Sequence, residues 1–200
     1  DDVESRGLGD VYKRQVLLNR HISAYQSKMV KYISEAYMQT TSGLIAEDVK
    51  VLRRTLNHLE DERKNWKVIR RKELVGLRKI DPLQAVEKDT WFHLACNSCE
   101  QSLYCLKRMC EPSLEHVDNN FNPLSRECIE EILPVKKKIV DYLMRSERIV
   151  EDRDYEHIDA LLAEEEAYKQ QLSEMRRAQE DRIQMDLSQG LKAVSYTHLR

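Results

Sequence analysis

Two cysteines separated by two residues, Cys96 and Cys99 in the stretch "CNSC", have the spacing of a zinc knuckle or a redox pair. A structural zinc site needs four ligands, and no second pair with matching spacing follows. A redox pair of this kind normally lies beside a strand–helix–strand unit, for which the sequence gives no signal. Cys96, Cys99 and Cys110 instead share one helical stripe with Phe92, Leu103 and Leu106. We therefore interpret these thiols as small apolar side chains of a helical core.

A second group of polar residues could in principle share a metal ion. Asp89 and His93 lie four residues apart, and Glu100 follows seven residues later, so all three lie along one side of a helix. One helix supplies too few ligands, and an Asp–His pair at this spacing is an ordinary polar contact. Three other histidines have no evident partner and are expected at the surface, namely His58, His116 and His157.

The sequence carries no recognised catalytic pattern. We find no nucleophile motif, no glycine-rich phosphate loop and no pair of catalytic carboxylates. The prediction is therefore that the chain is not an enzyme, with no catalytic residues, no cofactor-binding residues, no cofactor and no metal ligands.

The two ends of the chain are related through their coding DNA. "DVYKRQ" (Asp10–Gln15) can be written gat gtg tat aag aga cag, and the reverse complement of this DNA encodes Val-Ser-Tyr-Thr-His in another frame. That peptide opens "VSYTHL" (Val194–Leu199), so one short element in opposite orientations encodes both ends. It resembles the transposon end used to fragment DNA for sequencing libraries. We interpret residues 1–15 as disordered read-through, residues 194–200 as read-through, and residues 16–193 as the natural domain.

The composition favours long helices. With 34% charged residues, 6% aromatic residues, five glycines and four prolines, the chain has few residues that interrupt helices. The odd number of cysteines, five, favours reduced thiols in a reducing compartment. A net charge of −2 gives no reason to expect a nucleic-acid partner. No stretch of about 18 apolar residues predicts a membrane-spanning helix.

Apolar periodicity divides the chain into five expected helices. The break after the first is "TTSGL" (Thr40–Leu44), and the break before the fourth is "NNFNP" (Asn119–Pro123). Pro134 is expected to kink the fourth helix. The expected ranges are Leu17–Thr40, Ala46–Ile80, Pro82–Asp118, Leu124–Val150 and Tyr155–Leu187. The residues expected to face inward on the last two are Ile129, Leu133, Ile139, Leu143, Val150, Ile158, Leu162, Tyr168, Leu172, Met175 and Ile183.

Charge is distributed unevenly along these helices. The stretch Arg53–Lys79 has ten basic and four acidic residues, whereas Glu151–Asp186 has twelve acidic and five basic ones. Two interpretations remain open. The charges can be solvated faces of a bundle in which the acidic fifth helix neutralises the basic second one. Alternatively, the basic helix faces anionic lipid headgroups or a partner.

Three segments carry a family resemblance. "LLNRHISAYQSKMVKYI" (Leu17–Ile33), "SLEHVDNNFNPLS" (Ser113–Ser125) and "LSEMRRAQEDRIQ" (Leu172–Gln184) resemble the PhoU-like region at the C-terminus of bacterial sodium/phosphate cotransporter family proteins. The resemblance is greatest to those of Bacteroides-type bacteria, and it covers Val16–Lys192.

The resemblance implies an all-α fold, an antiparallel bundle of long helices arranged as two three-helix bundles with the last helix truncated. It also implies a non-catalytic regulatory role in sodium-dependent phosphate uptake, at the cytoplasmic face of the bacterial inner membrane. The implied partner is the upstream transmembrane transporter region of the same protein, and an oligomer remains open.

The sequence lacks one pattern that is found in this family. Members of the family bind metal clusters through an acidic residue followed four positions later by aspartate, and Val16–Ala193 lacks this pattern. The nearest matches, Asp152/Glu156 and Glu111/Glu115, end in glutamate. The alternative function is a soluble helical scaffold, or a free-standing PhoU-type phosphate-signalling adaptor.

Overall fold

The structure is a computed structural model that describes the backbone of residues 2–77 and 82–197. It describes the side chains of residues 24–72, 75, 90 and 92–186. The helices are α1 (Asp2–Ile45), α2 (Val49–Leu77), α3 (Pro82–Asp118), α4 (Arg126–Asp152) and α5 (Ile158–Thr197). No strand occurs in the described backbone, which confirms the predicted all-α class. Two compact units divide the chain, Asp1–Asp154 with α1 to α4, and Tyr155–Arg200 with α5.

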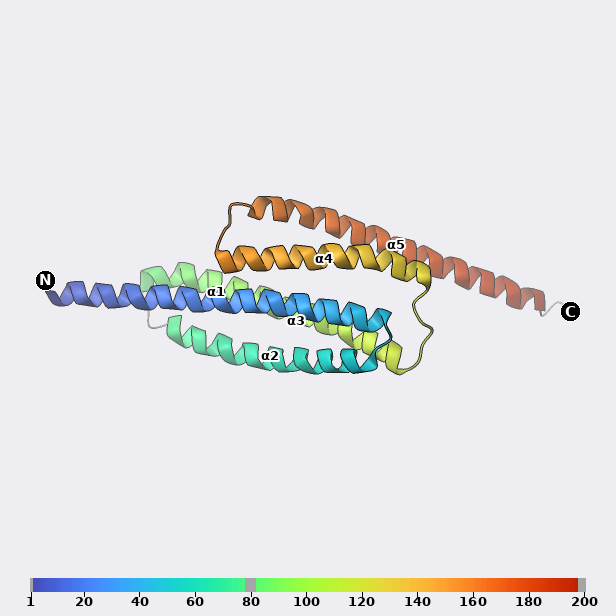
Figure 1. Cartoon of the computed structure of the whole chain (residues 1–200), viewed down its shortest axis with the longest axis horizontal. Coiled ribbons are helices and arrows are strands. Elements are labelled where there is room, and N and C mark those ends of the chain that lie inside the picture. The colour runs from blue at the N-terminus through green and yellow to red at the C-terminus, as the bar shows by residue number, and fades with distance from the viewer. Residues whose placement is uncertain (1, 78–81, 198–200) are drawn as a thin grey trace. The chain divides into compact units, whose positions relative to one another are not determined.

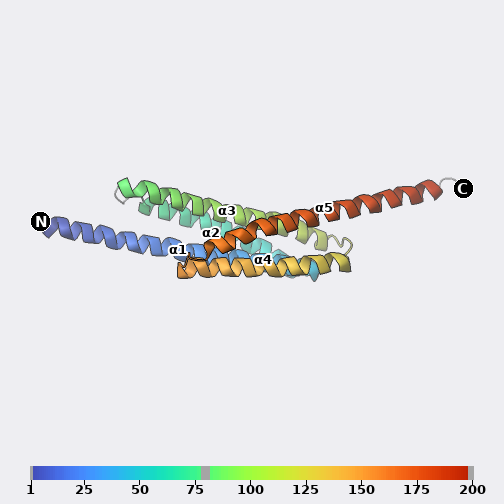
Figure 2. The same ribbon diagram turned by 90° about the horizontal axis from the view of Figure 1, so that it is seen from above.

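In the first unit, successive helices run in alternating directions (Figure 1). α1, α2 and α3 all contact one another and form a three-helix bundle, and α4 packs along α1. Seen from above, α3 and α4 lie at opposite edges of this unit (Figure 2). The antiparallel bundle expected from the sequence is therefore present for α1 to α4.

The turn between α1 and α2 differs from the prediction. α1 continues through "TTSGL" to Ile45, because the Thr41 hydroxyl is held at 2.9 Å from the Tyr37 carbonyl and threonine is thereby accommodated within the helix. The helix ends where Glu47 adopts a left-handed conformation with φ 53°. Asp48 then accepts a hydrogen bond from the Val51 amide at 3.0 Å, which caps the start of α2.

The boundaries of α3 and α4 lie closer to the predicted boundaries than the end of α1 does. α3 begins at Pro82 and ends at Asp118, and residues 119–125 form the predicted loop before α4. The Ser125 hydroxyl accepts a hydrogen bond from the Cys128 amide at 3.2 Å and so caps α4. At its other end, α4 stops at a left-handed Arg153 with φ 55°.

The core of the first unit lies between α1, α2 and α3. Leu52 and Leu59 of α2 and Leu103 of α3 are each 0% exposed. Every residue of the predicted α3 stripe is buried, so this part of the prediction is confirmed. These residues are Phe92, Cys96, Cys99, Leu103, Leu106 and Cys110.

Close contact between α1 and α2 depends on Gly43. A Cβ atom added there would lie 2.9 Å from Leu52 Cγ and 3.0 Å from its Cδ2. Gly43→Ala should therefore lower the free energy of unfolding by about 1 kcal/mol, because overpacking outweighs the better helix propensity of alanine. In a Leu52→Ala background the same change should be stabilising, because the added methyl group then fills space. Urea unfolding of the two single variants and the double variant measures this reversal of sign; destabilisation in both backgrounds would contradict it.

Helices α4 and α5 bury less than the sequence predicts. Leu133 was expected to face inward but is 46% exposed, whereas its neighbour Val135 is the buried residue of α4. The reason is that the apolar arc of α4 is wide, and only part of it lies against α1. In α5, Leu162, Leu172 and Ile183 are also exposed, contrary to prediction. α5 is the only helix of its unit, so no second helix in that unit can cover its stripe.

The helix α1 begins at Asp2, within the segment interpreted as read-through. Extending an existing helix costs little, and this segment contains no proline. At the other end α5 runs to Thr197, and residues 198–200 lie outside the described residues. The division between the two compact units follows Asp154.

Within the described part of the chain, no helix has the length and apolar character that crossing a membrane requires.

Candidate functional site

The cysteine pair with metal-like spacing is part of the core. Cys96 and Cys99 are buried, and the Cys110 thiol donates to the Leu52 carbonyl at 3.6 Å. Burial raises the pKa of Cys99 to about 12 and also raises the pKa of Cys110, because a thiolate would lose its hydration. Among the described residues, no three histidine, cysteine or acidic side chains gather as metal ligands would. The structure thus supports a packing role for these thiols.

Reaction with a thiol reagent should separate the cysteines by burial. In the folded protein at mildly alkaline pH, the exposed Cys105 should react rapidly, whereas Cys96, Cys99 and Cys110 should react only after unfolding. The raised pKa values of Cys99 and Cys110 leave too little thiolate for attack, and Cys96 is protected by its burial. Replacing Cys105 by serine should remove the most rapid phase and leave the reaction of the partly exposed Cys128. Rapid reaction of Cys99, or zinc that co-purifies with the chain and is lost on changing Cys96 and Cys99 to alanine, would contradict the packing role.

The three residues Asp89, His93 and Glu100 are not brought together as a described site. The side chain of Asp89 lies outside the described residues. Glu100 is instead held by α2, where Arg70 Nη1 lies 3.1 Å from its Oε2. His93 is half-buried next to Phe92, with ring centroids 6.0 Å apart.

Two of the three histidines expected at the surface lie where the sequence predicted. His58 and His157 are exposed. His116 differs, because it is half-buried and its ring packs against Phe121 of the following loop, with centroids 5.7 Å apart. Its Nε2 atom is buried without a hydrogen-bond partner among the described residues. The bend of the chain after α3 produces this contact, and no spacing in the sequence indicates it.

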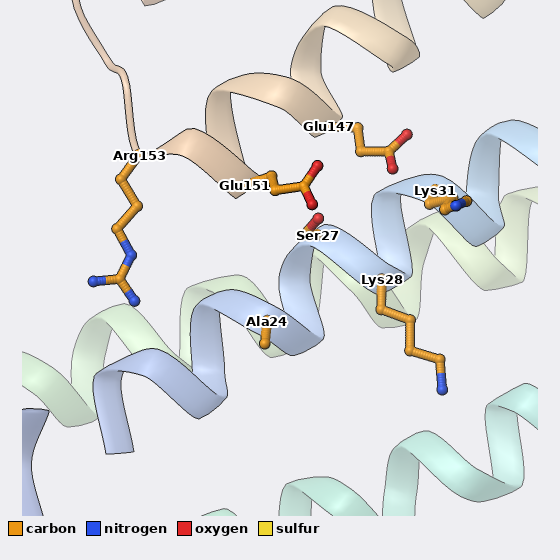
Figure 3. Close-up of a pocket in the computed structure, with 7 residues that line it drawn as sticks. All are labelled: Ala24, Ser27, Lys28, Lys31, Glu147, Glu151 and Arg153. Carbon is orange, nitrogen blue, oxygen red and sulfur yellow. The ribbon is translucent and has the colours of Figure 1, made fainter. Parts of the chain in front are cut away.

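An open hollow of about 440 Å³ lies between α1 and the end of α4. In Figure 3, Glu147 and Glu151 extend from α4 towards α1, with Ser27 facing Glu151, while Lys28 points away from both carboxylates. Most of the lining side chains are exposed, and both signs of charge are present. The full set is Ala24, Ser27, Lys28, Lys31, Glu147, Glu151 and Arg153. Because both signs of charge line the hollow, it favours neither an anion nor a cation as a ligand. It is a solvent-exposed gap between two helices.

The basic helix α2 is partly neutralised by α3. Arg53 Nη2 lies 3.0 Å from Asp118 Oδ1, and Arg70 pairs with Glu100. We expected the acidic fifth helix to supply any internal partners. For Arg53 and Arg70, the partners come from the neighbour in the three-helix bundle instead.

Four of the remaining cations of α2 lie on one exposed side of the helix. Lys64, Lys67, Arg71 and Lys72 all point outwards, and Val68 and Val75 among them are 50% and 57% exposed. We call these six residues the α2 cationic strip. Lys64 is paired with Asp61 at 3.2 Å, whereas Lys67, Arg71 and Lys72 form no ion pair with any described residue. Arg78 and Lys79, also part of the predicted basic stretch, lie outside the described residues.

The strip combines positive charge with exposed apolar groups on one side of a helix. Positive side chains are attracted to anionic lipid headgroups, and branched aliphatic side chains can enter the headgroup region. The α2 cationic strip is therefore the strongest candidate for a binding surface among the described residues. The sequence indicated that α2 is basic. It did not indicate which of its cations belong to the strip, because that depends on the ion pairs that Arg53 and Arg70 form with α3.

In comparisons with known proteins, no family model matches the chain, and no curated protein or solved structure matches it either. The PhoU-like resemblance of Val16–Lys192 therefore stays a prediction.

Proposed function

We propose that this chain is a non-catalytic accessory or regulatory domain of a sodium-dependent phosphate cotransporter, of the PhoU-like type. The observation that carries the proposal is the mutual packing of α1, α2 and α3 into an antiparallel three-helix bundle, followed by a loop and further helices. This is the arrangement that the resembling segments imply for the first half of such a domain.

The nature of the core supports a role without chemistry. It is filled mainly by leucines, cysteines and aromatic rings, together with a few hydroxyl side chains. The Thr55 hydroxyl, for example, lies 3.0 Å from Gln39 Oε1 and 2.9 Å from the Val51 carbonyl. Such a core stabilises helices against one another and offers a rigid surface to a partner.

The proposed location is the cytoplasmic face of the bacterial inner membrane, beside the transmembrane region of the same protein. There the α2 cationic strip would lie against anionic headgroups, each basic residue near the surface contributing about 1 kcal/mol. Arg53 and Arg70 are not assigned to this contact, because they already pair with Asp118 and Glu100.

Phosphate uptake tests the proposed function. Cells lacking their own phosphate transporters would express the intact gene, or the same gene without the codons for residues 16–193. Sodium-dependent uptake of radioactive phosphate should differ between the two in its response to external phosphate, while the transporter itself remains in the membrane. Identical uptake at equal transporter levels would contradict the proposal. A gene that supports no sodium-dependent uptake in either form would favour a scaffold or a free-standing adaptor.

A further inference from the structure

The α2 cationic strip has apolar residues at its centre. Val68 and Val75 lie seven residues apart, which places them about two turns apart on one side of the helix. Both side chains are exposed, by 50% and 57%. Arg71 and Lys72 lie three or four residues from each valine. Residues at that spacing are neighbours on a helix surface, so both valines have the same two cations beside them.

Folding does not account for these two valines. Neither of them belongs to the core, which α2 enters with other residues such as Leu59 and Trp66. At an exposed helical position, the β-branched valine is also a poorer helix former than alanine, lysine or glutamine. One exposed valine is ordinary, but here two lie in line among cations, about 10 Å apart along the helix. Together they form a surface feature that the fold does not require.

The chemistry of this surface fits an anionic bilayer. Lysine and arginine have long, flexible stems, which allow their charges to reach the lipid phosphates while apolar groups beside them lie deeper. An acidic protein surface would also attract the cations, but it would bury the valines only if it had an apolar groove between its carboxylates. A bilayer offers charged headgroups and hydrocarbon together over its whole surface.

We propose that Val68 and Val75 enter the headgroup region of an anionic bilayer, with the neighbouring cations held at the lipid phosphates. α2 then lies parallel to the membrane over this half of its length, and α1 and α3 pack on the side of α2 that faces away. α2 forms one edge of the first unit (Figure 1). This mode of binding rests on the proposed location beside a membrane, and it adds an apolar contribution to the electrostatic one.

Val68→Phe tests the insertion as a gain of binding. Phenylalanine has more apolar area to bury than valine, so the full chain should bind at least about threefold more tightly to vesicles of phosphatidylcholine and phosphatidylglycerol. The gain should persist at 1 M salt, where a Debye length of about 3 Å screens the cations. Met144→Phe is the matched control, because Met144 is 46% exposed on α4, which packs along α1. It should leave vesicle binding unchanged.

Changing Val68 and Val75 together to glutamine tests the loss. Glutamine removes the apolar groups, leaves the net charge unchanged and is a better helix former than valine. Binding to the same vesicles should fall at least about threefold. Binding to soluble poly-glutamate, which offers negative charge without hydrocarbon, should stay the same. Changing Lys67, Arg71 and Lys72 to glutamine should weaken binding to both. Circular dichroism should show equal helix content in all variants.

Three results would overturn the insertion. The first is a chain that does not bind the vesicles at all. The second is vesicle binding that neither valine variant alters, because headgroup charge alone then explains it. The third is an equal loss towards vesicles and poly-glutamate in the glutamine variant, because the strip then binds an acidic chain. The response of phosphate uptake to removal of residues 16–193 is measured separately, so the proposed function can fail or hold independently of these results.

Discussion

Replacing Leu52 or Leu103 by alanine is expected to lower the free energy of unfolding by about 2–5 kcal/mol in each case. Both side chains are 0% exposed, and they come from the two facing helices α2 and α3. The loss combines the transfer energy of the removed atoms with the cavity that they leave. Urea unfolding followed by circular dichroism measures it, with the change in midpoint converted through the slope of the transition.

The control for this experiment is an apolar residue of α2 that is not buried in the core of the bundle. Val68 of α2 is 50% exposed, so Val68→Ala should change the free energy of unfolding by less than about 0.5 kcal/mol. Equal effects at Leu52 and Val68 would mean that α2 does not turn the predicted side towards α3, and the three-helix bundle would then be wrong.

Changing Lys67, Arg71 and Lys72 together to glutamine should weaken binding to anionic vesicles on the order of 100-fold. This estimate follows from about 1 kcal/mol for each basic residue near the surface. Glutamine has a helix propensity close to that of lysine and arginine, so helix content should not change. Co-sedimentation with phosphatidylglycerol-containing vesicles measures the effect. Binding should also fall with salt, as the Debye length shortens from about 10 Å at 0.1 M to about 3 Å at 1 M.

A second triple variant distinguishes the effect of the α2 cationic strip on vesicle binding from the effect of net charge. Lys137, Lys138 and Arg148 are exposed on α4, and changing them to glutamine removes the same number of cations. Vesicle binding should then remain close to that of the unmodified chain. If the two triple variants bind equally weakly, attraction depends on total charge and the α2 cationic strip has no special role. A loss of folding stability in the α2 variant would instead show that the strip has partners within the protein.

The sequence predicted the buried side of α3 because burial there is a local property. Residues such as Cys96, Leu103 and Cys110 recur at helical spacing, and any helix with that stripe must cover it. The same helical spacing predicts that the thiols are core side chains. The loop after Asp118 and the helix start at Pro82 were also predictable, because proline and asparagine act on their immediate neighbours.

The partners of charged side chains were not predictable in this way. Arg53 and Asp118 are far apart in the sequence, and their pairing depends on which two helices become neighbours. The composition shows that α2 is basic and α5 acidic, but it does not identify the helix that packs against α2. The exposure of Leu133 was missed for a related reason, since an apolar arc does not reveal which part of it faces α1.

The end of α1 was misjudged because two tendencies compete there. Consecutive threonines and Gly43 are poor helix formers, which predicted a break. In the structure the Thr41 hydroxyl bonds back to the preceding turn, and Gly43 allows the backbone to approach Leu52. The packing of α1 against α2 thus outweighs local propensity over this last turn.

The most direct test of the central claim, that the chain is an accessory domain of a membrane transporter, is the DNA sequence of its source locus around the codon for Val16. We expect the reading frame to continue upstream of Val16 without the codons for "DVYKRQ", and to encode several apolar segments of about 20 residues. A start codon directly before Val16, or an upstream region without such segments, would contradict the claim.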